Sequence, residues 1–175
     1  MLVVNTFSPD EPLDEVIAAA KHLPHVTFYV SGDLKRSEGH LQEKAPDNVH
    51  FTGFLPRESF YDLMASSQAV MCLTTRDHTM QNGACEALSM ARPIITSRWS
   101  LLQSYFSQGT VYVDNTAEAI ADGVREMMLN HSRYEAEIRQ LQAKQRLVWK
   151  SATRALAQVV ERSLRGTSRT MAGGR

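Results

Sequence analysis

The residues whose types suggest chemistry are concentrated in one polar loop and in the helix expected to follow it. The loop covers residues 74–81 and contains Arg76, Asp77 and His78, and Glu86 lies in the helix-forming run GACEALSMA that comes next. Histidine changes its charge near neutral pH, so His78 is a candidate for proton transfer. The first N–H groups of a helix are unpaired and lie at the positive end of its dipole. This stretch therefore predicts a site for an anionic ligand.

Two short apolar strands are expected to flank this loop and helix. Residues 70–73, VMCL, form an apolar run of strand length, and Ile94 and Ile95 begin another strand after Arg92 and Pro93 end the helix. A polar loop that leaves a strand and enters a helix is where an open α/β sheet binds its ligands. The predicted site thus lies at the carboxyl edge of a sheet.

The rest of the first 130 residues alternates between short apolar runs and amphipathic runs. Further strands are expected at residues 2–4, 26–30, 49–52 and 110–113. Helices are expected at residues 13–23, 56–67 and 117–130, with shorter helical turns at 39–44 and 98–108. Helices separate the strands, and no hairpin signal of the Asn-Gly type joins two of them. The pattern predicts an α/β fold of the Rossmann-like kind, a three-layer parallel sheet of about six strands with helices on both faces.

From about residue 133 the pattern becomes helical throughout. An approximate apolar stripe includes Ile138, Leu141, Val148 and Val159, which indicates one long C-terminal helix or a kinked pair that ends at Gly166. We therefore expect a Rossmann-like domain over residues 1–132, a basic amphipathic helical segment over 133–166 and a disordered tail over 167–175.

Composition excludes several classes of protein. The 175 residues are 43% apolar and 22% charged, no run approaches the roughly 20 apolar residues of a membrane span, and the first residues do not resemble a signal peptide. A cytoplasmic location is expected. Cys72 and Cys85 lie in apolar contexts and read as buried thiols, and the histidines have no metal-ligand spacing, so no metal or resident cofactor is expected. Asp33 and Asp77 are too few for the acidic cluster of a receiver domain, and no GxSxG hydrolase motif is present.

The formal net charge of zero conceals an asymmetry along the chain. Residues 1–132 carry 9 basic and 16 acidic side chains, whereas residues 133–175 carry 10 basic and 3 acidic ones. A basic segment of this kind suits an anionic membrane or an acidic partner surface, which would make the protein peripheral at a membrane; no nucleic-acid partner is expected. The ordinary alternative is that the basic helix lies near the acidic domain of its own chain.

Several motifs together resemble a known family. Gly32 follows the second strand, VHFTGF ends the third at Gly53, the helix PRESFYDLMASS comes next, and EALSMARPIITS ends the site-bearing stretch. This order is similar to the C-terminal, nucleotide-sugar-binding domain of GT-B glycosyltransferases of the retaining family-4 type. The similarity covers residues 1–130, and the terminal helix resembles the one that closes that fold across its interdomain cleft. It implies a domain that binds a nucleotide-diphosphate sugar for transfer of a hexose-type sugar to an acceptor hydroxyl. The acceptor domain, expected in cis on the N-terminal side or on a separate chain, is absent from this sequence.

The resemblance also implies roles for individual residues. Two glutamates separated by seven residues hold the donor in that family; Glu86 matches the second, which contacts the ribose, and His78 replaces the first, which contacts the sugar. His78 is therefore the candidate for a sugar contact or a catalytic acid/base role, and Glu86 for bonds to the ribose hydroxyls. The other implied donor-binding residues lie in two loops. The first loop has N–H groups suited to the sugar and the diphosphate and consists of Thr79, Met80, Gln81, Asn82 and Gly83. The second contributes Gly53 and Phe54. Without this context, a first-turn glutamate and a loop histidine would be ordinary structural features.

One loop departs from the family pattern. The family has a glycine-rich turn after the first strand, with an arginine and a lysine that neutralise the diphosphate, but here the segment reads NTFSPDEP, with Thr6 and Glu11 at those places. A carboxylate beside a diphosphate lowers affinity through repulsion. The candidates to compensate for the missing cations are the side chain of Arg76, the hydroxyls of Thr6 and Ser8, or a basic residue supplied from outside this chain. The alternative hypothesis is a catalytically degenerate GT-B-like module that binds or scaffolds a partner glycosyltransferase chain.

Overall fold

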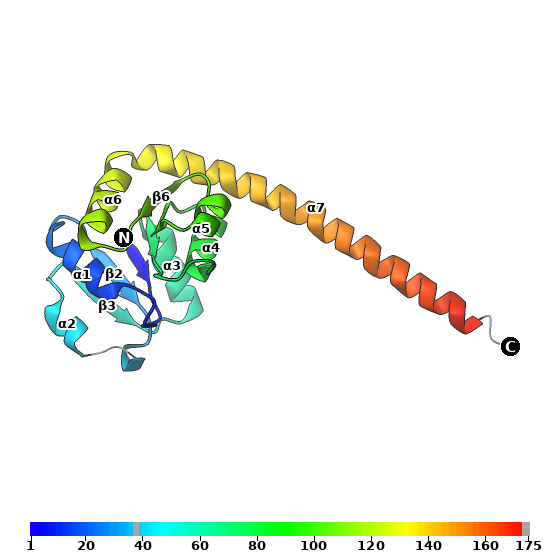
Figure 1. Ribbon diagram of the computed structural model, residues 1–175, viewed down its shortest axis with the longest axis horizontal. Helices are drawn as coiled ribbons and strands as arrows, with labels where there is room; N and C mark the ends of the chain where they lie inside the picture. The colour runs from blue at the N-terminus through cyan, green and yellow to red at the C-terminus, as the bar shows by residue number, and fades with distance from the viewer. Residues whose placement is uncertain (37–38, 173–175) are drawn as a thin grey trace. The chain divides into compact units, whose positions relative to one another are not determined.

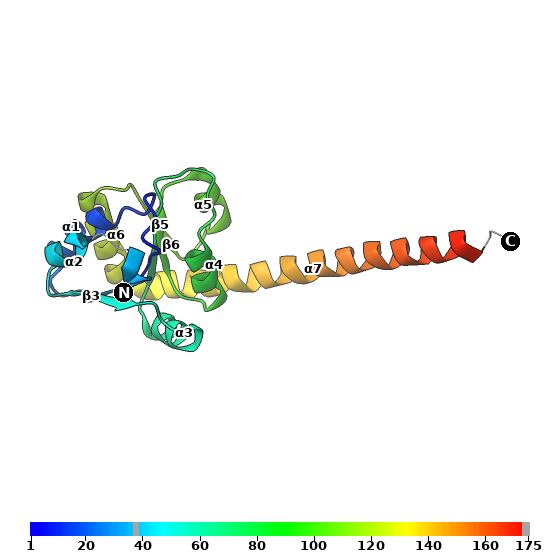
Figure 2. The ribbon, with the colours of Figure 1, turned by 90° about the horizontal axis from the view of Figure 1, so that it is seen from below.

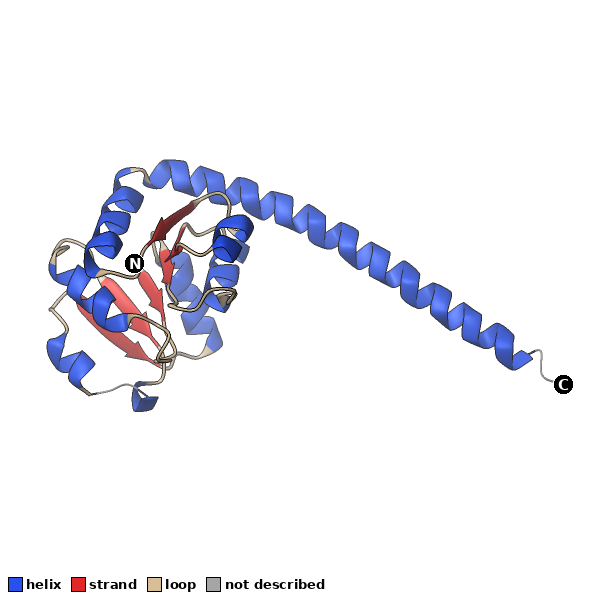
Figure 3. Ribbon diagram, in the orientation of Figure 1, coloured by secondary structure: helices blue, strands red, loops and turns tan. Residues whose placement is uncertain are grey.

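The computed structural model describes residues 1–36 and 39–172. Six strands form one sheet in the order β3-β2-β1-β4-β5-β6, and every neighbouring pair is parallel (Figure 3). The strands are β1 (Leu2–Val4), β2 (Phe28–Ser31), β3 (Val49–Gly53), β4 (Val70–Cys72), β5 (Ile94–Ser97) and β6 (Thr110–Val113). The order reverses between β1 and β4, and such a topological switch point is where open α/β sheets bind ligands. The predicted α/β class and parallel sheet are confirmed.

Helices cover both faces of the sheet, as predicted (Figures 1 and 2). The helices are α1 (Leu13–Lys21), the 3-10 turn η1 (Leu34–Arg36), α2 (His40–Lys44), α3 (Arg57–Ser66), α4 (Asn82–Ser89), α5 (Ser100–Tyr105), α6 (Ala117–Leu129) and α7 (His131–Ala172). Buried side chains of α1, α2 and α6 form one apolar cluster with the sheet. Those of α3, α4 and α5 form a second cluster on the opposite face.

The three central strands β1, β4 and β5 are buried on both faces, and β1 and β4 read as continuous apolar runs for that reason. In β1, Val3 belongs to the cluster under α1 and α6, whereas Leu2 belongs to the cluster under α4. The same alternation places Met71 on the first face and Val70 and Cys72 on the second. Successive strand residues point to opposite faces, so a strand covered on both sides needs apolar residues at every position.

The first turns of α7 are part of the α/β unit. Tyr134, Ile138 and Leu141 are buried, and the compact unit extends from Met1 to Leu141. The boundary expected at residue 132 therefore lies inside this unit and not at its end. Residues 142–175 form the second unit.

The long helix differs from its expected end. α7 continues through Gly166 to Ala172, so residues 167–172 are helical where a disordered tail was expected, and residues 173–175 lie outside the described part of the chain. A single glycine in a helix interior costs only about 1 kcal/mol, which neighbouring helix formers can offset. In the described part of the chain, no helix is both long enough and apolar enough to cross a membrane.

Candidate functional site

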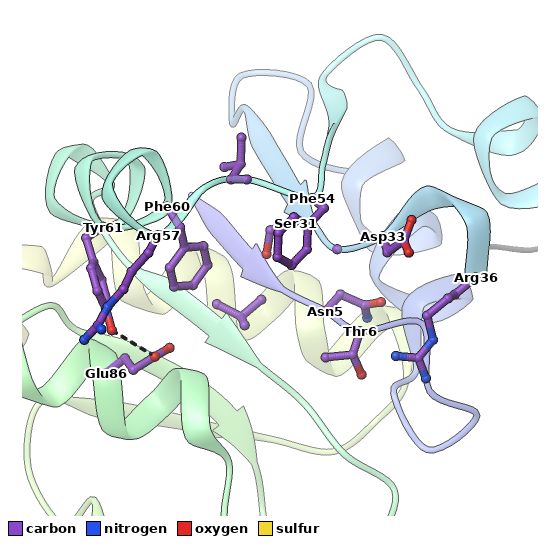
Figure 4. Close-up of a pocket in the computed structure, with 13 residues that line it drawn as sticks. Asn5, Thr6, Ser31, Asp33, Arg36, Phe54, Arg57, Phe60, Tyr61 and Glu86 are labelled. Atoms are coloured by element: carbon purple, nitrogen blue, oxygen red, sulfur yellow. Dashed lines mark hydrogen bonds between the residues drawn. The ribbon is translucent and has the colours of Figure 1, made fainter.

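A cavity of about 680 Å³ opens at the carboxyl ends of β1, β2 and β3, beside α3 and α4 (Figure 4). This volume is in the range of small-molecule binding sites. Its lining residues come from the ends of the first two strands, from the loops after all three and from the two helices: Val4, Asn5, Thr6, Ser31, Gly32, Asp33, Arg36, Phe54, Leu55, Arg57, Phe60, Tyr61 and Glu86. Three residues predicted for donor binding, Thr6, Phe54 and Glu86, are among them.

Aromatic side chains make up much of the pocket wall. Phe54 follows β3 directly after Gly53 and is 80% exposed, and Phe60 and Tyr61 come from α3. A phenylalanine exposed to this extent offers a flat apolar surface that another ring can cover. The turn from Gly53 to Pro56 therefore gives the pocket a stacking surface at its rim.

Glu86 stands at one end of the pocket with Tyr61 and Arg57. The Tyr61 hydroxyl donates a hydrogen bond of 3.2 Å to Glu86 Oε1, and the Arg57 guanidinium lies 5.5 Å from the centre of the Tyr61 ring (Figure 4). α4 begins at Asn82, so Glu86 lies in its second turn and not in the first turn, where it was expected. The helix dipole acts mainly on the first turn, so it gives little reason for a glutamate at this position.

The opposite end of the pocket is polar. Asn5 is buried, and its Oδ1 accepts a hydrogen bond of 2.7 Å from the Phe7 N–H. Gly32 has φ of +138°, and a Cβ there would lie 2.5 Å from the Asn5 carbonyl oxygen. The glycine after β2 thus allows the loop after β1 to lie directly against it. Thr6 and Arg36, both exposed, and the half-buried Asp33 complete this end (Figure 4).

The loop after β1 is held by its own glutamate. Glu11 Oε2 accepts hydrogen bonds from the N–H groups of Thr6, at 2.8 Å, and Ser8, at 3.0 Å. The Thr6 hydroxyl also donates to both oxygens of this carboxylate, each at 3.1 Å. Phe7, between the two N–H groups, has φ of +57°. Backbone of this kind forms a concavity that binds anions, and here the anion is a side chain of the same loop.

Asp10 joins the loop after β1 to the loop after β4. Its carboxylate accepts hydrogen bonds from the hydroxyls of Ser8, at 2.5 Å, and Thr74, at 2.8 Å, and its carbonyl oxygen accepts from the Thr75 N–H at 2.7 Å. The Arg76 Nε lies 3.9 Å from the same carboxylate. These hydroxyls, followed by the nearby guanidinium, lower the pKa of Asp10 below its usual value, although partial burial opposes the shift. Arg76 therefore lies beside an aspartate and does not line the pocket.

The remaining loop residues predicted for the site do not line the cavity. The His78 side chain is 82% exposed, and its Nε2 lies 3.4 Å from Asp77 Oδ2. The backbone N–H of His78 donates a hydrogen bond of 2.7 Å to the other oxygen of that carboxylate, Oδ1. Ser8 and Gly53 are also outside the lining, and so are the residues at the start of α4: Thr79, Met80, Gln81, Asn82 and Gly83.

Gly83 serves packing. It is buried, and a Cβ there would lie 2.7 Å from Val4 Cγ1 and 2.9 Å from Cys72 Sγ. α4 can thus press directly against β1 and β4, which positions Glu86 one turn further along the helix. The close backbone approach that this glycine permits is therefore to these two strands.

The sequence interpretation missed Arg57 and Tyr61. They are four residues apart in the helix that follows the Phe54 turn, so they lie on one helix face. That spacing, next to a predicted site loop, was a signal that could have identified them. Arg36 and Asn5 gave no comparable signal, because each comes from a loop whose shape depends on distant contacts.

The two cysteines do not take part in the pocket. Cys72 is buried and Cys85 half-buried, and burial raises the pKa of both thiols, which disfavours the reactive thiolate form. Within residues 1–36 and 39–172, no group of three or more His, Cys, Asp or Glu side chains is arranged to hold a metal ion.

Solved structures of several glycosyltransferases are similar to this chain. Sucrose-phosphate synthase from Thermosynechococcus elongatus has a TM-score of 0.62 at 17% identity, with 88% of this chain and 46% of that chain covered. Alr3699/HepE from Anabaena, in complex with UDP and glucose, has a TM-score of 0.64 at 16% identity, with 86% and 48% covered. The pneumococcal O-GlcNAc transferase GtfA, in complex with UDP and GlcNAc, has a TM-score of 0.66 at 13% identity, with 91% and 35% covered. At these identities the likeness shows the fold, and the chain spans half or less of each relative's length.

The sequence itself carries the family assignment. A search of the curated proteins finds no match. The family model of the glycosyl transferases group 1, however, matches residues 2–130, which is nearly the whole α/β unit. This chain therefore belongs to the glycosyl transferases group 1 family, with a domain of the GT-B type.

Proposed function

We propose that this domain is the donor-binding half of a retaining glycosyltransferase and that its pocket holds the nucleoside part of a nucleotide-diphosphate sugar. The observation that carries the proposal is the pairing, in one cavity, of an exposed aromatic surface, Phe54, with a carboxylate, Glu86. A nucleobase stacks on an aromatic ring, and a carboxylate accepts hydrogen bonds from two ribose hydroxyls. Family membership and relatives whose solved structures contain UDP support this reading.

Each pocket residue has a role in the proposed complex. The base stacks on Phe54, Glu86 accepts bonds from the ribose hydroxyls, and Tyr61 orients Glu86 through its hydroxyl. The N–H groups at the start of α4, from Thr79 to Gly83, face the sugar and the leaving diphosphate, where they stabilise developing negative charge. His78 is the candidate to contact the transferred sugar.

The proposed reaction moves a hexose-type sugar from the diphosphate to an acceptor hydroxyl. The anomeric carbon exchanges its bond to a phosphate oxygen for a bond to the acceptor oxygen, and the nucleoside diphosphate leaves with the proton of the acceptor hydroxyl. Because the chain spans half or less of the relatives' length, the acceptor site is assigned to a further domain of the GT-B type. That domain is either N-terminal in the same polypeptide or part of a separate chain.

Titration with nucleosides and nucleotides tests the proposal. Isothermal calorimetry and NMR with uridine, UDP, guanosine and GDP should show one series binding, with shifted resonances in the Phe54 turn and α4. Glu86→Ala should weaken nucleoside binding about tenfold, the loss expected for charge-assisted hydrogen bonds. Glu118→Ala, an exposed glutamate of α6, is the matched control. No response at millimolar ligand, or equal binding by wild type and Glu86→Ala, would overturn it.

A second candidate, a catalytically degenerate module that scaffolds a partner glycosyltransferase chain, is favoured by one observation. The charges of Glu11 and Arg76 are satisfied inside the domain, by the loop after β1 and by Asp10. In a complex with such a partner, Glu86→Ala would leave transferase activity unchanged. If this domain instead supplies the donor site, the same substitution reduces activity.

We further propose that the second unit binds an anionic membrane surface. Val148, Trp149, Leu156, Val159 and Val160 are all exposed, and they recur at the spacing of one helix face. Over residues 142–161 the helix carries four basic side chains, Lys144, Arg146, Lys150 and Arg154, against one acidic side chain, Glu161. An exposed apolar face that includes tryptophan, with cations elsewhere on the same helix, is the pattern of helices that lie in a membrane interface.

Vesicle binding tests this surface. The protein should co-sediment with vesicles that contain phosphatidylserine, should not co-sediment with phosphatidylcholine alone, and should be released by salt. The double variant Lys150→Glu, Arg154→Glu should abolish binding, whereas Arg125→Glu on α6 should not. Equal binding to both vesicle types, or self-association through α7 in place of vesicle binding, would contradict the proposal.

A further inference from the structure

The loop after β1 occupies the place where the topology of the sheet predicts a ligand, yet its anion-binding groups are already used. The loop leaves β1 at the switch point, and Thr6 lines the main pocket. Two N–H groups, of Thr6 and Ser8, and the Thr6 hydroxyl all donate to the Glu11 carboxylate, at 2.8–3.1 Å. A convergent set of backbone N–H groups and a hydroxyl is equally suited to phosphate oxygens.

The Glu11 carboxylate is anchored in this position from several sides. Its own backbone N–H donates to the Ser8 carbonyl oxygen at 2.9 Å, and prolines 9 and 12 restrict the chain on either side. The preceding residue, Asp10, has a side chain only 14% exposed, which bonds to the loop after β4. Removing the carboxylate from the N–H groups therefore means breaking a loop that is fixed to its neighbour.

The occupied concavity adjoins the proposed nucleoside site. Glu11 lines a neighbouring cavity of about 290 Å³, and Arg36 lines both this cavity and the main pocket. A phosphate attracted toward Arg36 and Thr6 would meet donors that already hold a carboxylate. Two anions cannot share these donors, because each N–H points to one acceptor and the like charges repel.

We infer that Glu11 is an internal anion that competes with the phosphates of a nucleotide for the loop after β1, and so limits how much the diphosphate adds to binding. This inference rests on the proposed function, because it assumes that the nucleoside part binds in the main pocket. It makes Glu11 the residue that determines specificity for the charged part of the donor. The nucleoside contacts, at Phe54 and Glu86, do not depend on it.

The test compares uridine, UDP and inorganic pyrophosphate on wild type, Glu11→Gln and Glu11→Ala by calorimetry. Wild type should gain little affinity from the diphosphate, so UDP should bind only slightly more tightly than uridine. Glu11→Ala, which frees the donors, should bind UDP at least about tenfold more tightly and acquire measurable pyrophosphate binding, with uridine affinity unchanged. Glu11→Gln, which removes the charge but keeps the shape, should show a smaller gain. Glu118→Gln removes the same charge from α6 and should behave as wild type.

The outcomes separate this inference from the proposed function. If the affinity ratio of UDP to uridine stays constant in both folded Glu11 variants and pyrophosphate does not bind them, Glu11 is a structural residue and the inference is wrong. If neither wild type nor any variant binds a nucleoside, the proposed function is wrong. Pyrophosphate binding by the Glu11 variants, but not by wild type, would still support the role of Glu11 as a competing anion. Thermal unfolding shows whether each variant is still folded. Glu11→Gln keeps a side-chain oxygen that can accept hydrogen bonds from the N–H groups of the loop, so it provides a folded variant if Glu11→Ala unfolds.

Discussion

On the β3 side of the switch point, the carboxyl ends of β1, β2 and β3 surround an open cavity whose rim carries Phe54. On the β4 side, the loops after β1 and β4 meet, and their polar groups bond to one another through Asp10 and Glu11. The cavity with Phe54 is the open region, and the bonded loops after β1 and β4 are the closed region. Both regions lie at the same edge of the same sheet. The difference therefore comes from loop side chains, and it shows that sheet topology gives the place of a site, while the loops decide which part of a ligand it can hold.

Gly83 supports both regions, so its substitution should have the largest effect. Gly83→Val places branched carbons where even a Cβ would lie 2.7 Å from Val4 and 2.9 Å from Cys72. Overpacking of this kind lowers the free energy of unfolding by about 3 kcal/mol, which urea denaturation measures. Gly39→Ala is the control, because no atom lies within 4 Å of a Cβ there. Equal stability of the two variants would show that α4 can move away from β1 and β4.

Phe54 distinguishes the open region from the closed one. Phe54→Ala should weaken nucleoside binding about tenfold, through the loss of stacking, and should leave the unfolding free energy unchanged because the ring is exposed. Titration with the nucleoside that binds wild type, together with urea denaturation, measures both effects. Leu129→Ala, at an equally exposed apolar position of α6, should change neither. Unchanged nucleoside affinity in Phe54→Ala would remove the aromatic surface from the site.

The fold was more predictable than the site because its signals are local. Most strands are short apolar or β-branched runs between turn residues, and the alternation with helices indicates parallel pairing. Phe54, Thr6 and Glu86 were predicted for donor binding from the resemblance, and they line the pocket. The positive φ of Phe7, which turns the backbone so that Glu11 can bond to it, is not readable from the residue type.

Contacts between distant loops were equally invisible in the sequence. The pairing of Arg76 with Asp10 joins residues 66 positions apart, and it places the arginine beside a carboxylate when it was expected to serve a diphosphate. Such contacts depend on how the loops after two strands meet once the sheet has formed. Motif matching names the residues of a site, but it does not determine which of them satisfy each other.

Tyr61 tests how firmly the open region is organised. Tyr61→Phe removes the hydroxyl that donates to Glu86 at 3.2 Å but keeps the ring under Arg57. Nucleoside affinity should fall about threefold, since one neutral-to-charged hydrogen bond that only orients the carboxylate is lost. Tyr29→Phe, on an exposed face of β2, is the control in the same titration. A loss as large as that of Glu86→Ala would mean that the hydroxyl itself contacts the ligand.

Asp10 gives the smallest effect, and its pH dependence identifies the closed region. The hydroxyls of Ser8 and Thr74 lower the pKa of Asp10, so the folded protein favours the ionised carboxylate. A lowered folded-state pKa contributes stability that is complete above the unfolded value, about 3.9, and is lost as the pH falls through the folded value. The difference in unfolding free energy between wild type and Asp10→Asn should therefore be full at neutral pH and shrink below about pH 4. Asp47→Asn, which removes an exposed charge, controls for net charge. If the Asp10 difference stays constant down to about pH 3 in urea denaturation, the loops after β1 and β4 are not held together by this carboxylate.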